Sequence, residues 1–253
     1  MPVKDATQRF SSRVENYVRY RPGYPREVVA LLKEACGLTS GAVIADIAFG
    51  TGIFTRMLLD NGNRIFGVEP NADMRRAGEE FLAGYSGFTS VTGTAEATTL
   101  ADHSIDTVTA AQAAHWFDCE KARREFVRIL KPGGSLVLLW NDRRMDSTEF
   151  LRQYEQLLRT YGTDYEDVRQ QGMTLAIEGF FGPSFHTRAF EYKQTFDYAG
   201  LEGRLLSSSY APQKDSPKYD PMLRELRRIF DGQQVNGKVS FDYDTRVYYG
   251  QLA

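Results

Sequence analysis

Residues 43–52 read Val-Ile-Ala-Asp-Ile-Ala-Phe-Gly-Thr-Gly, a short apolar run that ends in an acid and a glycine turn. Apolar residues at helical spacing follow at once, in residues 53–59. A buried strand, a tight turn and a helix in this order open a nucleotide-binding α/β sheet. Small residues in such a turn let the backbone approach a ligand closely. This unit limits the possible fold classes more than any other part of the chain.

The middle of the chain alternates strand-like and helix-like segments with short connections. The helix over residues 71–85 should begin at Asn71, a residue type that caps helix N-termini. The alternation predicts a doubly wound, mostly parallel sheet with right-handed crossovers. Ligands of such sheets bind beyond the carboxyl ends of the strands, so we expect the functional residues there. The expected strands are 42–47, 64–69, 88–93, 105–111 and 135–140, and the other two expected helices are 52–60 and 120–130.

The pattern changes after Asp142. Before this point, we expect Lys131-Pro132-Gly133-Gly134 to end the helix over residues 120–130. The segments expected beyond this point are helices at 147–161 and 220–231, the second opened by Pro221, a Gly/Phe-rich loop at 179–183, a strand at 189–196 and a final strand at 239–249, at a sheet edge.

Length and composition bound the class of protein. The chain has 253 residues, which suits one α/β domain with insertions, and a net charge of −2, which argues against a nucleic-acid partner. Two isolated cysteines, Cys36 and Cys119, do not make a disulfide framework. Residues 1–13 lack the apolar stretch of a signal peptide, and no apolar run reaches the ~20 residues of a membrane span. We therefore expect a cytoplasmic location and no membrane partner.

Other chemistries find little support in the sequence. The three histidines have no metal-ligand spacing, so we expect no metal site. The chain has no Gly-x-Ser-x-Gly elbow and no phosphate-binding Walker loop. Residues 48–53 also lack two of the three glycines of a dinucleotide fingerprint, which disfavours a nicotinamide oxidoreductase. The turn favours an adenosine ligand without a phosphate to cradle.

The turn resembles the cofactor-binding motif of class I S-adenosylmethionine-dependent methyltransferases, Asp-x-Gly-x-Gly-x-Gly. Asp46, Gly50 and Gly52 match this motif, and Ala48 replaces its first glycine. Residues 67–74, 93–97 and 130–134 resemble three further motifs of the family, in order and at the expected spacing. The resemblance covers roughly residues 10–141.

The resemblance implies roles for residues at the strand ends. Glu69 would accept hydrogen bonds from both ribose hydroxyls, as an acid about 20 residues past the turn can. Ala95 would offer its backbone N–H to the adenine ring, and Glu96 would accept from its exocyclic amine. The fold implied is a Rossmann-like, doubly wound seven-stranded sheet with one antiparallel edge strand and helical cap insertions. The cofactor implied is S-adenosylmethionine.

Residues 112–118, Gln-Ala-Ala-His-Trp-Phe-Asp, resemble a subgroup that includes trans-aconitate methyltransferase-like proteins. This resemblance implies that Gln112 and Ala113 line the methionine side of the cofactor. His115 and Trp116 would face the acceptor, with His115 as the candidate catalytic residue. A structural histidine is the alternative.

The N-terminal segment carries a second part of this resemblance, in Phe10, Tyr17, Tyr20 and residues 21–25. The segment closes over the cofactor in the family. A tyrosine hydroxyl and a guanidinium can hold the methionyl carboxylate, and Tyr20 and Arg21 are the first candidates. A surface helix whose tyrosines pack on the core is the alternative.

These observations predict methyl transfer to a small-molecule acceptor by in-line displacement, driven by proximity and desolvation. The identity of the acceptor and the oligomeric state stay open. We expect a single domain over 1–253, with a lid at 1–25, a cofactor-binding core at 26–141, a cap at 142–190 and completing strands and helices at 191–253. The expected cofactor residues are Tyr20, Arg21, Asp46, Ala48, Phe49, Gly50, Thr51, Gly52, Glu69, Pro70, Met74, Thr94, Ala95, Glu96, Gln112 and Ala113, and the expected substrate pocket is Tyr17, His115, Trp116 and Trp140.

A rival hypothesis is a non-catalytic or weakened cofactor-binding protein of the same fold. Ala48 places a Cβ where the family keeps bare backbone, and Phe49 is bulkier than the residues common at that position. Either residue could narrow the methionyl pocket.

Overall fold

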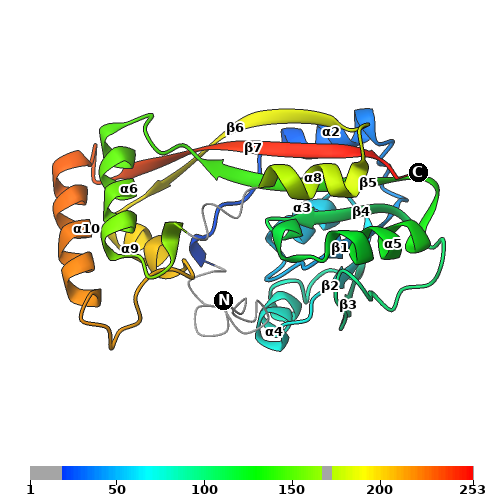
Figure 1. Cartoon of the computed structure of the whole chain (residues 1–253), viewed down its shortest axis with the longest axis horizontal. Helices are drawn as coiled ribbons and strands as arrows, with labels where there is room; N and C mark the ends of the chain where they lie inside the picture. Colours follow the sequence, from blue (N-terminus) through cyan, green and yellow to red (C-terminus); the bar gives the residue numbers. More distant parts are fainter. Residues whose placement is uncertain (1–18, 167–172, 253) are drawn as a thin grey trace.

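The computed structural model describes residues 19–166 and 173–252. Its centre is a seven-stranded sheet in the order β3-β2-β1-β4-β5-β7-β6 (Figure 1). The first five strands run parallel, and β7 runs antiparallel to both of its neighbours. The expected doubly wound, mostly parallel sheet is confirmed. The strands are β1 (Val43–Ile47), β2 (Arg64–Val68), β3 (Phe88–Val91), β4 (Ile105–Ala111), β5 (Leu130–Arg143), β6 (His186–Phe196) and β7 (Val239–Gln251).

The position expected for the final strand is wrong. β7 pairs with β5 on one side and with β6 on the other, so it lies inside the sheet and β6 is the outer strand. Alternating apolar and polar residues indicate that one face of a strand is buried, but they do not indicate whether the strand pairs on one side or on both. β7 alternates in this way, whereas most residues of β6 are exposed or half-buried, as on an outer strand.

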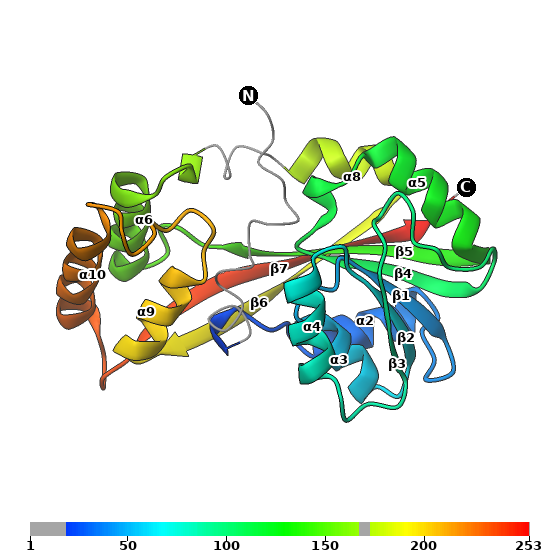
Figure 2. The ribbon, with the colours of Figure 1, turned by 90° about the horizontal axis from the view of Figure 1, so that it is seen from below.

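Helices cover both faces of the parallel part of the sheet (Figure 2). One face carries α2 (Glu27–Ala35), α3 (Ile53–Asp60) and α4 (Ala72–Phe81), and the opposite face carries α5 (Cys119–Ile129) and α8 (Met173–Phe181). Asn71 caps α4, because its side chain accepts from the backbone N–H groups of Asp73 and Met74. The expected cap is therefore confirmed.

Two turn predictions need correction. The Gly/Phe-rich segment is not a loop up to Phe181: α8 includes Phe180 and Phe181, and both rings are buried against the sheet face that α5 also covers. Aromatic residues drive this helix into the core, and the chain turns only at Gly182, whose φ is +69°. Residues 131–134 follow α5 as expected, but they form an irregularity within β5.

The last strands continue beyond the parallel core and carry a second lobe (Figure 1). β5, β6 and β7 are 14, 11 and 13 residues long. Their far ends pack against α6 (Glu149–Tyr161), α9 (Tyr198–Leu206) and α10 (Tyr219–Gln233) around a separate apolar cluster. In this cluster the ring of Tyr154 meets the ring of Phe241 edge-on, with centroids 4.9 Å apart. In the part of the chain described, no helix has the length and apolar character that crossing a bilayer requires.

The bulky residue of the glycine turn packs into the first lobe. The Phe49 side chain is 7% exposed and meets Phe88 edge-on. Two glycines make room for its ring: a Cβ at Gly67 would lie 2.8 Å from Phe49 Cδ1, and a Cβ at Gly78 would lie 2.5 Å from Phe49 Cε2. The ring therefore occupies a notch between β2 and α4.

We expect Gly78→Ala to lower the free energy of unfolding by about 1–3 kcal/mol, because its methyl group overlaps the Phe49 ring and lies 2.9 Å from the Gly50 carbonyl oxygen. Gly232→Ala in α10 is the matched control, because a Cβ there meets nothing within 4 Å and alanine favours a helix by up to about 1 kcal/mol. Urea unfolding of both variants measures the difference. A neutral Gly78→Ala would contradict this packing.

Candidate functional site

Two adjoining cavities lie at the carboxyl ends of the parallel strands. The inner cavity has a volume of about 210 Å³, and the interlobe cavity, which reaches the second lobe, has about 670 Å³. Both are lined by the residues that follow β1 and β4, namely Ala48, Gly50, Ala111, Gln112 and Trp116. The rest of the inner cavity is lined by Glu69, Pro70, Asn71, Met74, Thr94, Ala95, Glu96, Ala113 and Phe117.

The turn after β1 is left-handed at three positions. Ala48, Gly50 and Gly52 have φ values of +53°, +59° and +84°. A Cβ at Gly52 would lie 2.7 Å from the side chain of Leu82, so this glycine serves the packing of α3 and lines neither cavity. Ala48 keeps a Cβ in a conformation that costs a non-glycine residue about 1–2 kcal/mol. Such strain often accompanies functional turns.

Asp46 holds the turn from below. Its Oδ2 accepts from Thr55 Oγ1 of α3 at 2.6 Å, and its Oδ1 accepts from Thr109 Oγ1 of β4 at 2.8 Å. The carboxyl group is buried and lines the interlobe cavity. Burial raises the pKa of Asp46 to about 6, although the two hydroxyl donors act in the opposite direction. One side chain thus joins a strand, a helix and the neighbouring strand at the site.

Glu69 connects the ends of the first two strands. Its Oε2 accepts from the backbone N–H of Gly50 at 3.0 Å, and its Oε1 accepts from that of Asn71 at 2.9 Å. Burial raises the pKa of Glu69, opposed by these backbone donors and by the charge of Arg75. Each carboxylate oxygen keeps lone-pair capacity toward the inner cavity.

The wall opposite Glu69 follows β3. Ala95 is buried there, and Glu96 Oε1 accepts from the backbone N–H of Asp118 at 2.9 Å, beside the start of α5. The second oxygen of Glu96 makes no hydrogen bond with the described residues.

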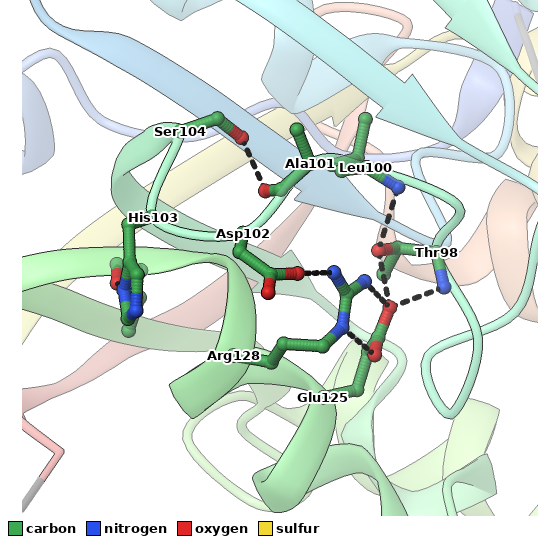
Figure 3. A network of polar contacts seen from close by, with 9 residues as sticks. Thr98, Leu100, Ala101, Asp102, His103, Ser104, Glu125 and Arg128 are labelled. Carbon is green, nitrogen blue, oxygen red and sulfur yellow. Dashed lines mark hydrogen bonds and ion pairs between the residues drawn. The ribbon is translucent and has the colours of Figure 1, made fainter.

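A polar network fixes the loop that leaves this wall (Figure 3). Glu125 of α5 accepts from the backbone N–H and the hydroxyl of Thr98, and Arg128 binds both Glu125 and Asp102. The Arg128 side chain, with the two Thr98 donors, lowers the pKa of Glu125 to about 2 despite partial desolvation. The loop therefore holds the inner cavity wall against α5.

The segment after β4 forms the junction of the cavities. Gln112 has a φ of +60°, and His115 and Trp116 follow in a 3-10 turn, η2 (Ala114–Trp116). Their rings lie 4.7 Å apart at 44°. His115 lines the interlobe cavity, whereas Trp116 lines both cavities.

Several expected site residues lie elsewhere. Trp140 is 3% exposed and packs edge-on against Tyr248 in the core under α8, so it lines neither cavity. Tyr20 packs against Phe196 of the second lobe and lines neither cavity. Aromatic side chains at strand ends and in cap segments bury large apolar areas, which explains both placements. Tyr17 lies outside the described residues.

Other expected residues stand at the interlobe cavity. Arg21 lines it and donates from Nη2 to the Ser207 carbonyl at 3.0 Å. Thr51 lines it with a buried hydroxyl that has no hydrogen-bond partner among the described residues. Phe49 also lines this cavity, although its ring packs in the core notch beside Gly78.

The sequence patterns singled out no residue of the second lobe on the far wall of the interlobe cavity. Part of this wall is formed by Arg204, Tyr210, Tyr243 and Arg246, from α9, β7 and the segments beside them, together with Arg143, Arg144 and Tyr165 of the expected cap. One signal was available: Leu201, Arg204 and Leu205 share one face of a helix, and a charged residue on an apolar face is unusual. No group of three metal-ligating side chains occurs in residues 19–166 and 173–252.

A family model described as a methyltransferase domain matches residues 45–138. An uncharacterised methyltransferase of Mycobacterium tuberculosis is 34% identical over 168 residues, which is 66% of this chain, and the match spans 65% of that relative. An uncharacterised methyltransferase of Schizosaccharomyces pombe is 29% identical over 94% of this chain and 95% of its own.

The fold is also found among solved structures. A proposed type II methyltransferase from Anaeromyxobacter dehalogenans superposes with a TM-score of 0.68 at 20% identity, over 92% of this chain and 98% of its own. At this identity the likeness concerns the fold.

Asp46→Asn should change how stability depends on pH. The pKa of Asp46 is about 6 in the folded protein and lower in the unfolded chain. The protonated carboxyl group therefore contributes to the free energy of unfolding below about pH 4, and this contribution is lost as the pH rises through 6. We expect the variant, at pH 7, to gain up to about 3 kcal/mol in the free energy of unfolding. Urea unfolding from pH 4 to 7 tests this, with Asp231→Asn on exposed α10 as control. A variant that keeps the wild-type pH slope would refute the assignment.

Proposed function

We propose, because this chain belongs to the class I S-adenosylmethionine-dependent methyltransferases, that it transfers a methyl group from S-adenosylmethionine to a small-molecule acceptor. One observation carries the proposal. The inner cavity brings Glu69, Ala95 and Glu96 together beside the glycine turn, and it shares Gly50 and Trp116 with the larger interlobe cavity. Such an arrangement suits a nucleoside in the first cavity and an acceptor in the second.

The polar groups fit the cofactor. Glu69 has acceptor capacity for the ribose hydroxyls, and Ala95 with Glu96 can hold the adenine ring. The buried hydroxyl of Thr51, which has no hydrogen-bond partner in the described part of the chain, and the guanidinium of Arg21 are suited to the methionyl end. We propose these roles, with Pro70, Met74, Thr94, Gln112 and Ala113 as the remaining walls.

When bound, the cofactor supplies a methyl group on a positively charged sulfur. Gln112 and Trp116 stand at the junction of the cavities, where they would orient the acceptor and exclude water. His115 can accept a proton there if the acceptor arrives protonated, and a carboxylate acceptor needs no base. We propose His115 as the general base for an acceptor that arrives protonated.

The wall of the interlobe cavity suggests how the chain is divided. Arg21, Pro22 and Tyr24 line it from the N-terminal segment, and residues 142–146 with Tyr165 line it from the segment after β5. We propose that these segments are a lid and a cap on a single methyltransferase domain.

A second candidate function is cofactor binding without efficient turnover. Ala48 favours it, because this residue lines both cavities in a strained backbone conformation. Incubating the protein with methyl-labelled S-adenosylmethionine and a metabolite extract separates the two: labelled product supports the transferase, and binding of S-adenosylhomocysteine without product supports the alternative.

Glu69→Gln should weaken S-adenosylhomocysteine binding by about 10–100-fold, because hydrogen bonds to a buried carboxylate are worth about 1.5–3 kcal/mol. Calorimetric titration measures this, with Glu79→Gln on exposed α4 as the matched control. Thermal unfolding checks that both variants fold. A folded Glu69→Gln protein with wild-type affinity would contradict the ribose role, and no binding by the wild-type protein would overturn the proposed function.

Phe49→Cys tests whether the unusual turn obstructs the cofactor. Its ring lies in the core, so we expect a loss of about 3 kcal/mol in the free energy of unfolding and no gain in S-adenosylhomocysteine affinity. Ala48→Gly, which relieves the positive φ, should be neutral or stabilise by up to about 1 kcal/mol. Tighter cofactor binding by Phe49→Cys would show that the ring narrows the pocket after all.

A further inference from the structure

We propose that the interlobe cavity holds an oxyanion of the methyl acceptor, a carboxylate or phosphate remote from the atom that is methylated, on Arg204 of α9. The inference rests on the proposed function and names the chemical class of its substrate.

Arg204 is a buried charge without a counterion. Its side chain lines the interlobe cavity although the residue is only 6% exposed. Nη1 donates to Ser208 Oγ at 3.1 Å, and Nε has no hydrogen-bond partner among the described residues. No described carboxylate lies within 4 Å of this guanidinium. A buried charge is costly unless it is paired, so a vacancy for an anion is expected beside it.

The other arginines of the second-lobe wall show the contrast. Arg143 pairs with Glu155, Arg144 with Asp244 and Glu191, and Arg246 with Asp142. Their charges are balanced within the protein, whereas Arg204 has no carboxylate partner among the described residues.

Neighbouring groups strengthen the positive field at this wall. Arg21 reaches the same wall, and the charges of Arg204, Arg143 and Arg21 all lower the pKa of Tyr210, which burial alone would raise. The Tyr243 hydroxyl is buried, lines the same cavity and interacts with the Arg204 guanidinium. A guanidinium with a phenol donor matches the geometry of a carboxylate or phosphate.

The position of Arg204 separates this anion from the cofactor. Arg204 belongs to the second lobe, whereas the residues proposed for the cofactor, apart from Arg21 of the N-terminal segment, follow β1, β2, β3 and β4. The interlobe cavity, at about 670 Å³, is large enough for a small-molecule acceptor that spans from His115 to Arg204.

The test uses the full chain saturated with S-adenosylhomocysteine. Succinate and inorganic phosphate are titrated separately at constant ionic strength, and the rise in Tm gives each affinity. We expect at least one probe to bind, and Arg204→Met to weaken that binding at least about tenfold. Arg204→Lys should retain phosphate better than succinate, because lysine offers a point charge and no fork. Arg228→Met on exposed α10 removes the same charge and should leave binding unchanged.

Three results would overturn the inference: neither probe binds the wild-type protein, Arg204→Met binds as well as wild type, or the probe displaces S-adenosylhomocysteine. The last would mean that Arg204 holds the methionyl carboxylate. If Arg204→Met does not fold, the test rests on the wild-type protein and Arg204→Lys. If these two proteins bind succinate with equal affinity and phosphate with equal affinity, the guanidinium is not the anion-binding group. Failure to bind S-adenosylhomocysteine at all would instead overturn the proposed function.

Discussion

The site depends on the buried carboxyl group of Asp46. Its two oxygens accept from Thr55 and Thr109, so one side chain joins β1, α3 and β4 where the sheet order turns back on itself. These bonds offset only part of the desolvation, which is why its pKa lies near 6. The turn that Asp46 supports presents the Gly50 N–H to Glu69, and this contact sets the floor of the inner cavity. The desolvation of Asp46 lowers the stability of the fold, but its hydrogen bonds hold the backbone of the turn in place at the ligand-binding edge of the sheet.

The inner cavity could be predicted because its residues lie in local motifs, and the rule that ligands meet parallel strands at their carboxyl ends brings those motifs together. Glu69 and Glu96 are far apart in sequence but follow neighbouring strands. No comparable rule predicts which residues of the second lobe come together. Whether β7 pairs on one side or two is a non-local property, and its alternation is the same in both cases. Arg204 and Tyr243 meet only because α9 packs beside the far end of β7, a contact that no spacing encodes. The helix α2 also went unpredicted.

The pair Ala48-Phe49 illustrates how a departure from a motif can be absorbed. A large side chain in the turn would fill the ligand space if it faced the cavities. The notch beside Gly67 and Gly78 takes the ring instead, so a position usually small becomes part of the core. Ala48 lines both cavities, whereas Phe49 lines only the interlobe cavity. Of the two residues, Ala48 is therefore in contact with more of the ligand space.

The two lobes are joined by continuous strands, and this matters for selectivity. β5 and β7 pair from Ser135 to Arg143, so the first and second lobes share one hydrogen-bonded frame. Asn141 lies toward the second-lobe end of this pairing, accepting from Thr245 Oγ1 and donating to the Gly23 carbonyl of the N-terminal segment. A paired strand resists bending more than a loop does, because bending breaks its ladder. The sheet therefore joins the lobe that carries the junction at Trp116 to the lobe that carries Arg204. An acceptor anchored by its anion would present only atoms at one distance to the methyl group, so such a frame selects acceptors by length as well as by charge.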